Sequence, residues 1–193
     1  MKAEKALAII LAAGASRRMG MPKALCRYEG RSFLAACVMA FRGAAVESLA
    51  VLGADGDQIA LHHPGMKTVR NPDWPNGQLS SAKVGLRAAI AQGANIVFIH
   101  PVDAPRISST TVSMLLATIR SGVHAAVPSA QGKTGHPLAV GFAGIEAILR
   151  ADVPTLWDAV QPLRPKNIPV IDRGAFENIN DPEEYKHLMG GNR

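Results

Sequence analysis

Short apolar runs alternate with amphipathic segments over the first two thirds of the chain. Apolar runs of strand length occupy residues 7–11, 49–52, 68–69 and 96–99. Between them, apolar residues recur every three or four positions, which predicts helices near residues 32–42, 58–62, 81–91 and 108–120. This alternation predicts an α/β fold, with a Rossmann-like, mostly parallel sheet in three layers and helices on both faces.

The pattern changes after residues 125–127, which form another apolar run. A polar, glycine-rich stretch over residues 129–135 predicts a loop. Beyond it, we expect strands over 138–142 and 168–171 and helices near 145–149 and 155–160. This second half is expected to be a lid and acceptor region built onto the first. Since no linker, repeat or low-complexity segment separates the two, residues 1–193 are expected to form one domain.

Composition and charge narrow the class of protein. With 193 residues and 48% hydrophobic content, the chain can fill the core of one such domain. A net charge of +6 is compatible with nucleic-acid binding, but the basic residues are spread along the chain and only 5% of residues are aromatic. We therefore expect small anionic substrates and no nucleic-acid partner. No apolar run approaches the ~18 to 20 residues that cross a bilayer, so no membrane partner is expected.

Two further features bear on the compartment. Lys2 and Lys5 precede an apolar run, as in a secretory signal peptide, but Glu4 interrupts the basic region and the run is short. Cys26 is expected in a loop and Cys37 on the apolar face of a helix, so both are interpreted as reduced thiols. We expect a cytoplasmic protein without a disulfide.

The most informative stretch follows the first apolar run. Gly14 and Gly20 lie among small residues together with three cations, Arg17, Arg18 and Lys23. At the carboxyl edge of a sheet, such a loop presents backbone N–H groups and positive charge, which suits a polyphosphate. The spacing of Gly14 and Gly20 matches neither of the two commoner phosphate-binding loops, Gly-x-x-x-x-Gly-Lys-Ser/Thr and Gly-x-Gly-x-x-Gly. An ordinary turn with solvated cations explains the glycines but not the concentration of charge around them.

Asp103 is a lone carboxylate placed just beyond an apolar strand, so it is expected at the same sheet edge as the Gly14 loop. A hard oxygen there can hold Mg²⁺ beside a phosphate, and Asp103 is our candidate metal ligand. The alternative is a turn-forming aspartate before Ala-Pro. Near the C-terminus, Asp181 is expected to cap a helix that begins at Pro182. Asn180 would also face the phosphate edge if a strand ended at Ile179.

Three other segments leave alternatives open. Residues 71–81 form a turn-rich strand exit whose N–H groups and hydroxyls could read a base or ribose, although helix capping by Ser80 or Ser81 is equally compatible. Gly135-His136-Pro137 could position an acceptor, but a single loop histidine more often packs or is solvated. Since the chain has no Gly-x-Ser-x-Gly and no Cys-x-x-Cys, covalent hydrolase chemistry and a structural zinc site have no support.

Taken together, the motif Leu11-Ala12-Ala13-Gly14-x-Ser16-x-Arg18-Met19-Gly20-x-Pro22-Lys23 resembles the signature loop of the molybdenum cofactor nucleotidyltransferases. The resemblance continues through further motifs in the same order: Asn71-Pro72-Asp73, Gly77-x-x-x-Ser81, Asp103-x-Pro105, Gly135-His136-Pro137 and Asn180-x-Pro182-Glu183. The chain is most similar to the cytidylyltransferase branch, whereas its Asn178-x-Asn180 ending resembles the guanylyltransferase branch. The resemblance implies a GT-A-like nucleotidyltransferase fold.

The resemblance also implies a reaction, in which CMP passes from CTP to the phosphate of molybdopterin and diphosphate is released. Arg18, Lys23 and Asp103 would be the catalytic residues, and Asp103 with Asn180 would hold Mg²⁺. The implied nucleotide-binding residues are Leu11, Ala12, Ala13, Gly14, Ser16, Arg18, Lys23, Asn71, Ser80 and Ser81. The implied acceptor-binding residues are Gly77, Gln78, Gly135, His136 and Pro137. A molybdoenzyme client would be a further partner.

The sequence leaves alternatives for the base, for the acceptor and for whether the protein is an enzyme. CTP is expected to be preferred over GTP, because the loop has the sequence Ala12-Ala13-Gly14. The methyl group at position 13 would narrow the pocket for the base. Guanylyl transfer to the same cofactor is the alternative. A sugar phosphate, a phosphoalcohol or methylerythritol phosphate could replace the acceptor. A cofactor-insertion chaperone without catalysis is disfavoured by the intact Arg18, Lys23 and Asp103.

Overall fold

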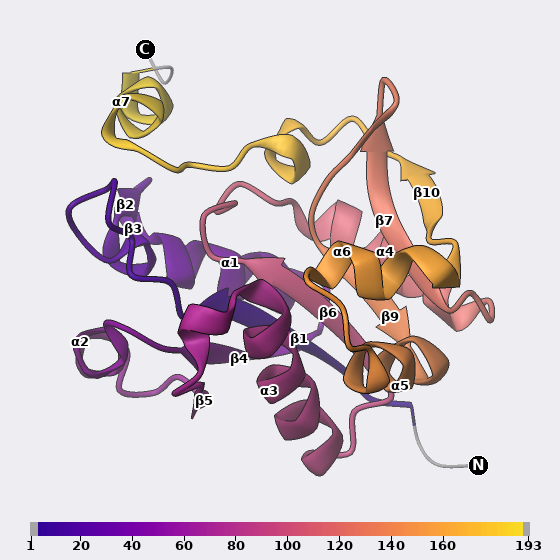
Figure 1. Cartoon of the computed structure of the whole chain (residues 1–193). Coiled ribbons are helices and arrows are strands. Elements are labelled where there is room, and N and C mark those ends of the chain that lie inside the picture. Colours follow the sequence, from indigo (N-terminus) through magenta and orange to yellow (C-terminus); the bar gives the residue numbers. More distant parts are fainter. Residues whose placement is uncertain (1–3, 191–193) are drawn as a thin grey trace.

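The computed structural model describes residues 4–190. Eight of its strands form one central sheet: β1 (Ala6–Ala12), β4 (Glu47–Leu52), β5 (Thr68–Arg70), β6 (Ile96–Pro101), β7 (Ala125–Ala130), β8 (Lys133–Thr134), β9 (Leu138–Gly141) and β10 (Lys166–Pro169). The order across the sheet is β10-β7-β9-β6-β1-β4-β5, and β8 pairs with β7 (Figure 1). A small separate hairpin consists of β2 (Arg27–Tyr28) and β3 (Arg31–Ser32).

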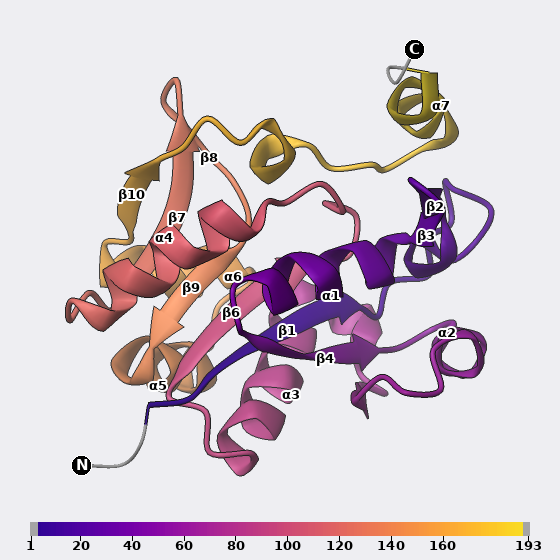
Figure 2. The same ribbon diagram turned by 180° about the vertical axis from the view of Figure 1, so that it is seen from behind.

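Helices cover both faces of this sheet. The α-helices are α1 (Phe33–Gly43), α2 (Gly56–His62), α3 (Gln78–Ala91), α4 (Ser109–Arg120), α5 (Phe142–Arg150), α6 (Leu156–Val160) and α7 (Pro182–Gly190). Short 3-10 turns are η1 (Lys23–Leu25), η2 (Trp74–Asn76), η3 (Gln161–Leu163) and η4 (Arg173–Phe176). Helices α3, α5 and α6 lie on the face seen in Figure 1, and α1 and α4 on the face seen in Figure 2. Within residues 4–190, no helix has the length and apolarity to cross a membrane.

The predicted three-layer, mostly parallel architecture is confirmed. Strand β1 pairs in parallel with β4 and β6, β4 with β5, and β7 with β10. Strand β9 runs antiparallel between β6 and β7, so the sheet is mixed at this point. Because β9 reverses direction, β7 and β10 point the same way as β6. The carboxyl ends of all these strands except β9 therefore meet at one edge.

Packing explains why the central strands are apolar throughout. The β1 side chains from Leu7 to Ile10 are fully buried, since helices cover both sides of the strand. Helix α3 approaches especially closely at Gly85, where an added Cβ would lie 2.8 Å from atoms of Ile9 and Val51. This close approach fixes the height of α3 over the sheet, and with it the loop that precedes the helix.

Several sequence expectations need correction. The second half is not a lid on the first, because β7, β9 and β10 extend the same sheet. The predicted loop over 129–135 contains β8, which forms a hairpin with the end of β7. Strand β10 begins two residues earlier than expected, at Lys166. Helix α3 begins at Gln78 and not near Ser81, so its N-cap is Gly77, with φ of 90° and no side-chain capping bond.

Candidate functional site

The loop after β1 is held in shape by its own small residues. The Lys23 backbone N–H donates to the Ser16 hydroxyl at 3.0 Å, and the Met19 N–H donates to the Ser16 carbonyl at 2.9 Å. Ser16 and Gly20 both adopt positive φ, which produces the sharp bends. The Met19 side chain is buried beneath the loop. Ser16 was predicted to bind nucleotide. In the structure, it accepts hydrogen bonds that hold the two ends of the loop together.

A cavity of about 260 Å³ opens beside this loop at the carboxyl edge of the sheet. Most of the residues predicted to bind phosphate and metal line it together with an apolar wall: Leu11, Ala12, Gly14, Ser16, Arg17, Arg18, Pro22, Lys23, Ala24, Ile59, Val102, Asp103 and Asn180. Ala13 is not part of this lining. It is buried, and its carbonyl accepts from the Ala54 N–H at 3.0 Å.

Three polar side chains converge inside the cavity from segments far apart in the sequence. The Lys23 ammonium donates to Asp103 Oδ2 and to Asn180 Oδ1, both at 2.8 Å. The Lys23 and Asp103 side chains are only 14% and 21% exposed. A cation this close to both oxygens brings their lone pairs to one point. The same two oxygens suit a hard divalent cation.

Asn180 reaches this point although no strand ends at Ile179, the condition under which the sequence placed it at the phosphate edge. The Ile179 N–H donates to the Asp103 carbonyl at 2.8 Å, which holds this part of the segment beside the loop after β6. The expected capping role of Asp181 is confirmed, since its carboxylate accepts from the N–H groups of Glu183 and Glu184 at 3.0 and 2.9 Å.

The Asn71 segment lies next to the first loop, but Asn71, Ser80 and Ser81 are not part of the cavity lining. Buried Asn71 donates through Nδ2 to the hydroxyls of Ser80 and Ser81, each at 3.0 Å. The segment packs tightly, because a Cβ at Gly53 would overlap the Ala13 carbonyl oxygen and lie 2.8 Å from Trp74. Neither serine caps α3, since both lie within the helix. Their hydroxyls instead hold Asn71 against the first turn of α3.

The two groups of predicted acceptor residues lie on different sides of the central strands. Gly77 and Gln78 stand at the start of α3, which packs on β1, β4 and β5. Gly135 and His136 follow the β8 hairpin, where the His136 N–H donates to the Ala175 carbonyl at 2.7 Å. Burial lowers the pKa of His136, and the Asp103 carboxylate opposes this shift. The Gly135-His136-Pro137 motif is therefore joined to the C-terminal segment through the His136 bond, whereas the Gly77 turn belongs to the start of α3.

One polar residue of the central strand was not recognised from the sequence. His100 is fully buried in β6, with Nε2 at 3.0 Å from the Ala104 carbonyl oxygen and no partner within the described structure for Nδ1. Burial lowers its pKa to about 3, so the ring is neutral at ordinary pH. Its ring stands 6.4 Å from that of His136. A histidine inside an otherwise apolar strand was the available signal.

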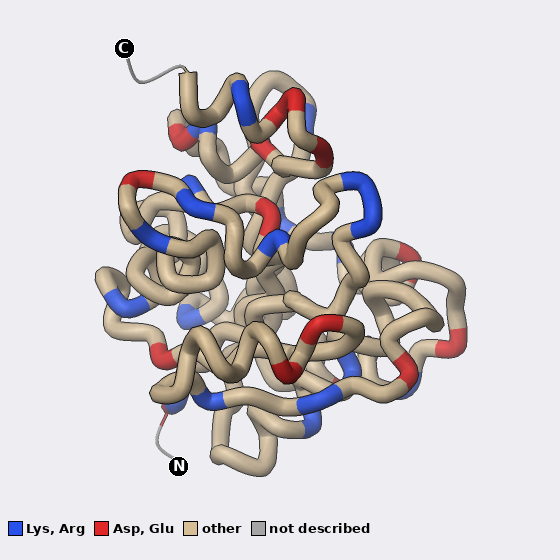
Figure 3. Tube along the Cα trace, turned by 90° about the vertical axis from the view of Figure 1, so that its left-hand side faces the viewer, with Lys and Arg blue, Asp and Glu red and all other residues tan. Residues whose placement is uncertain are grey.

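Metal-binding groups are sparse around this site. Within residues 4–190, no three or more His, Cys, Asp or Glu side chains gather in a metal-binding cluster. Cys26 and Cys37 are buried free thiols, and burial raises the pKa of both. On the side seen in Figure 3, Lys and Arg are interspersed with Asp and Glu. Asp103 and Asn180 are therefore the oxygens that remain for a cation at the Lys23 position.

Comparison with known proteins identifies a family and finds relatives with two different named activities. Residues 8–163 match the model of the MobA-like NTP transferase domain. A nicotine blue oxidoreductase from Paenarthrobacter nicotinovorans is 34% identical, over 94% of this chain and 95% of its own length. A molybdenum cofactor guanylyltransferase from Cereibacter sphaeroides is 29% identical, over 91% of each chain. The solved structure of a nucleotidyl transferase from Methanothermobacter thermautotroptrophicus superposes with a TM-score of 0.82 at 22% identity, covering 98% of this chain and 100% of the other.

Proposed function

Because this chain belongs to the MobA-like NTP transferase domain family, we propose that it transfers a nucleoside monophosphate from an NTP to the phosphate of a molybdopterin-type cofactor and releases diphosphate. The observation that carries this proposal is the convergence of Lys23, Asp103 and Asn180 beside a glycine-containing loop with two further cations. The guanylyltransferase names of several relatives support the acceptor.

In the proposed reaction, an oxygen of the acceptor phosphate attacks the α-phosphorus in line. The bond from the α-phosphorus to the bridging oxygen breaks, and that electron pair leaves with diphosphate. No protein nucleophile is required, because such transfers are catalysed by positioning and by neutralising charge. Lys23 and Arg18 would neutralise the triphosphate and the departing diphosphate. The backbone of the loop from Ala12 to Gly14 would bind the nucleotide.

The residues present fit a magnesium ion. Asp103 offers a carboxylate and Asn180 an amide oxygen, and both already point at one cation, the Lys23 ammonium. Mg²⁺ needs few protein ligands, since phosphate oxygens and water complete its coordination. Asp103 and Asn180 would hold the ion, which when bound would neutralise phosphate charge. Lys23 would then have to exchange these two oxygens for the phosphates of the nucleotide.

The choice of base rests on two observations that favour different nucleotides. The Ala12-Ala13-Gly14 loop is the reason that we predict CTP, and the relatives named as guanylyltransferases are the reason to keep GTP as the alternative. The methyl of Ala13 does not line the cavity, so it gives little direct support for excluding a purine. Hydrogen bonds from the Asn71 segment remain candidates for choosing the base, although this segment too lies outside the cavity lining.

The test is a diphosphate-release assay with each of the four NTPs, molybdopterin and Mg²⁺, comparing kcat/KM. CTP is expected to be preferred, and a preference for GTP would place the protein with the guanylyltransferases. Sugar phosphates, phosphoalcohols and methylerythritol phosphate serve as competing acceptors. Asp103→Asn should abolish Mg²⁺-dependent release, because an amide replaces the carboxylate ligand. Asp57→Asn, in an exposed ion pair with Arg70, is the matched control.

Two outcomes would redirect the proposal. If the protein binds molybdopterin but releases no diphosphate with any NTP, it would act as a cofactor carrier for a client molybdoenzyme. The oxidoreductase name of the 34% identical relative makes redox activity the second alternative. Oxidation of a reduced nicotinamide dinucleotide coupled to reduction of an added two-electron acceptor dye, with no diphosphate release, would favour it.

A further inference from the structure

We propose that Asp172 is a positioning residue of this site: it ties the segment that carries Asn180 to the loop that carries Asp103. The inference rests on the proposed function, because it concerns how the same two oxygens are brought together. Asp172 does not line the cavity beside the first loop and is not expected to touch substrate. Its effect would pass through the backbone to Asn180.

Asp172 joins the start of α4 to the C-terminal segment. Its Oδ2 accepts from the Ser108 N–H at 2.8 Å and from the Thr111 hydroxyl at 2.7 Å. Its Oδ1 accepts from the Gly174 N–H at 3.1 Å. Thr111 is 1% exposed, and its buried hydroxyl donates to this carboxylate while lying 3.1 Å from the Ser108 hydroxyl. Hydrogen bonds to an ionised group, placed where the helix dipole favours negative charge, make this a strong anchor.

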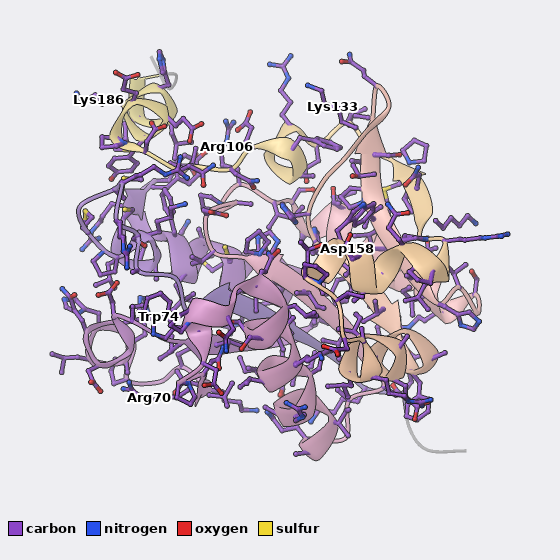
Figure 4. All side chains as sticks on the ribbon, in the orientation of Figure 1. Arg70, Trp74, Arg106, Lys133, Asp158 and Lys186 are labelled. Atoms are coloured by element: carbon purple, nitrogen blue, oxygen red, sulfur yellow. The ribbon has the colours of Figure 1, made fainter. Side chains whose placement is uncertain are left out.

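From this anchor, the two segments run antiparallel toward the site. Next along the C-terminal segment, a Cβ at Gly174 would overlap the Arg106 carbonyl oxygen, so the backbones touch there. Arg106, labelled in Figure 4, then pairs with Glu177 at 2.7 Å. The last tie is the bond of 2.8 Å from the Ile179 N–H to the Asp103 carbonyl. The contacts thus pass from Asp172 toward Ile179 on one segment and from Ser108 through Arg106 to Asp103 on the other.

The ties differ in strength, which is why Asp172 is singled out. The Arg106–Glu177 pair is 38% exposed on each side, and exposed ion pairs contribute little. The Ile179 bond is a single backbone bond at the site itself. Asp172 provides three hydrogen bonds, one of them to a buried hydroxyl. Loss of this anchor would leave Asn180 held by the exposed pair, the Ile179 bond, the bond from the His136 N–H to the Ala175 carbonyl and the contact with Lys23. None of these other ties joins the segment to the start of α4.

The experiment compares Asp172→Asn with Asp158→Asn. Asp158, labelled in Figure 4, is a matched carboxylate at the start of α6, where it accepts from the Thr155 N–H and hydroxyl. For Asp172→Asn we expect kcat for diphosphate release to fall about tenfold or more, since small misplacements of reacting groups are costly. The KM for the nucleotide should change less than about threefold. Hydrogen exchange of the Ile179 N–H should be faster.

A second pair of variants covers the case in which Asp172→Asn does not fold. Thr111→Val removes one donor to Asp172 at nearly equal volume, and Thr111→Ser keeps the hydroxyl. In Thr111→Val, kcat should fall in the same direction as in Asp172→Asn, but by a smaller factor. In Thr111→Ser, kcat should be close to that of the wild type. Unchanged kcat in the folded variants, or an equal fall in Asp158→Asn, would overturn the proposal.

Failure of the proposed function is separable from failure of this inference. If the wild-type protein releases no diphosphate, the nucleotidyl transfer proposal fails on its own. Hydrogen exchange at residues 173–181 then decides the tie without any substrate. Faster exchange in Asp172→Asn, but not in Asp158→Asn, supports the anchor, and equal exchange in all three proteins overturns it.

Discussion

Lys23 is the residue on which the site geometry depends most, because its ammonium contacts Asp103 and Asn180 at once. We predict that Lys23→Ala lowers turnover by about 10²-fold or more, the scale of losing one preorganised charge donor. The chain should still fold, since Asp103 keeps access to water through its 21% exposure. Diphosphate release and thermal unfolding of the same preparation measure the two effects.

Lys67→Ala provides the control for this prediction. Lys67 also pairs with a carboxylate, Glu47, but both side chains are more than half exposed and lie away from the cavity. Its removal should leave turnover unchanged. Turnover like that of the wild type in a folded Lys23→Ala protein would remove Lys23 from the catalytic residues.

His100 gives a prediction for stability against pH. Burial lowers its pKa from an ordinary value of 6.5 to about 3 in the folded protein, so between these values the unfolded chain binds a proton and the folded chain does not. The free energy of unfolding should therefore decrease as pH falls from 6.5 toward 3. Between roughly pH 7 and pH 5 the loss from this group is about 2 kcal/mol.

Denaturant unfolding at about pH 7 and about pH 5 measures this dependence. His100→Gln should reduce it, because glutamine stays neutral. His124→Gln, which changes an exposed histidine, controls for the substitution itself. An equal loss of stability on acidification in wild type and His100→Gln would show that other groups cause it.

Among the elements, the end of β4 packs closely against the first loop. Gly53 follows β4, and a Cβ there would overlap the Ala13 carbonyl oxygen and Trp74. We predict that Gly53→Ala destabilises the fold by about 1 to 3 kcal/mol and pushes the first loop away from the Asn71 segment. Its kcat/KM for the nucleotide should fall as well.

Gly65→Ala separates the steric effect from the loss of a glycine. A Cβ at Gly65 would meet no atom within 4 Å, so this variant should be neutral or slightly more stable. Urea unfolding of both variants measures the difference. Equal free energies of unfolding in the two variants would mean that the backbone after β4 shifts to accept the added methyl group without loss of stability.

At the scale of the whole molecule, the formal net charge of +6 should influence how an anionic nucleotide arrives. Long-range attraction to Arg17, Arg18 and Lys23 at the cavity is screened by salt, with a Debye length of about 10 Å at 0.1 M. We predict that kcat/KM for the nucleotide falls several-fold between roughly 0.05 and 0.5 M salt. The kcat value should change less.

Steady-state kinetics in NaCl at fixed free Mg²⁺ measures this effect. Exposed Arg17→Ala should flatten the salt dependence, whereas Arg150→Ala, on α5 away from the cavity, should not. A kcat/KM that does not respond to salt would show that charge near the cavity plays no part in nucleotide capture.

The sequence alone predicted the local features of this protein, because they depend on neighbouring residues. The periodicity of apolar residues predicted the helices and the alternation of the α/β fold, and the glycines and cations after β1 predicted a phosphate-binding loop. The capping by Asp181 was likewise readable from a short motif. Errors occurred where distant strands decide the outcome, as for the β8 hairpin within the predicted loop and for the second half, whose strands extend the same sheet.

Only the tertiary structure decided which of these features meet. Lys23, Asp103 and Asn180 come from three segments separated by 80 and 77 residues, and no spacing rule relates them. The order of strands brings the first two to one edge. Asn180 arrives through the antiparallel contacts that start at Asp172, a residue with no motif of its own. Local pattern thus determined the elements and the chemistry of each loop, and packing of the sheet determined the site, because non-local contacts bring its parts together.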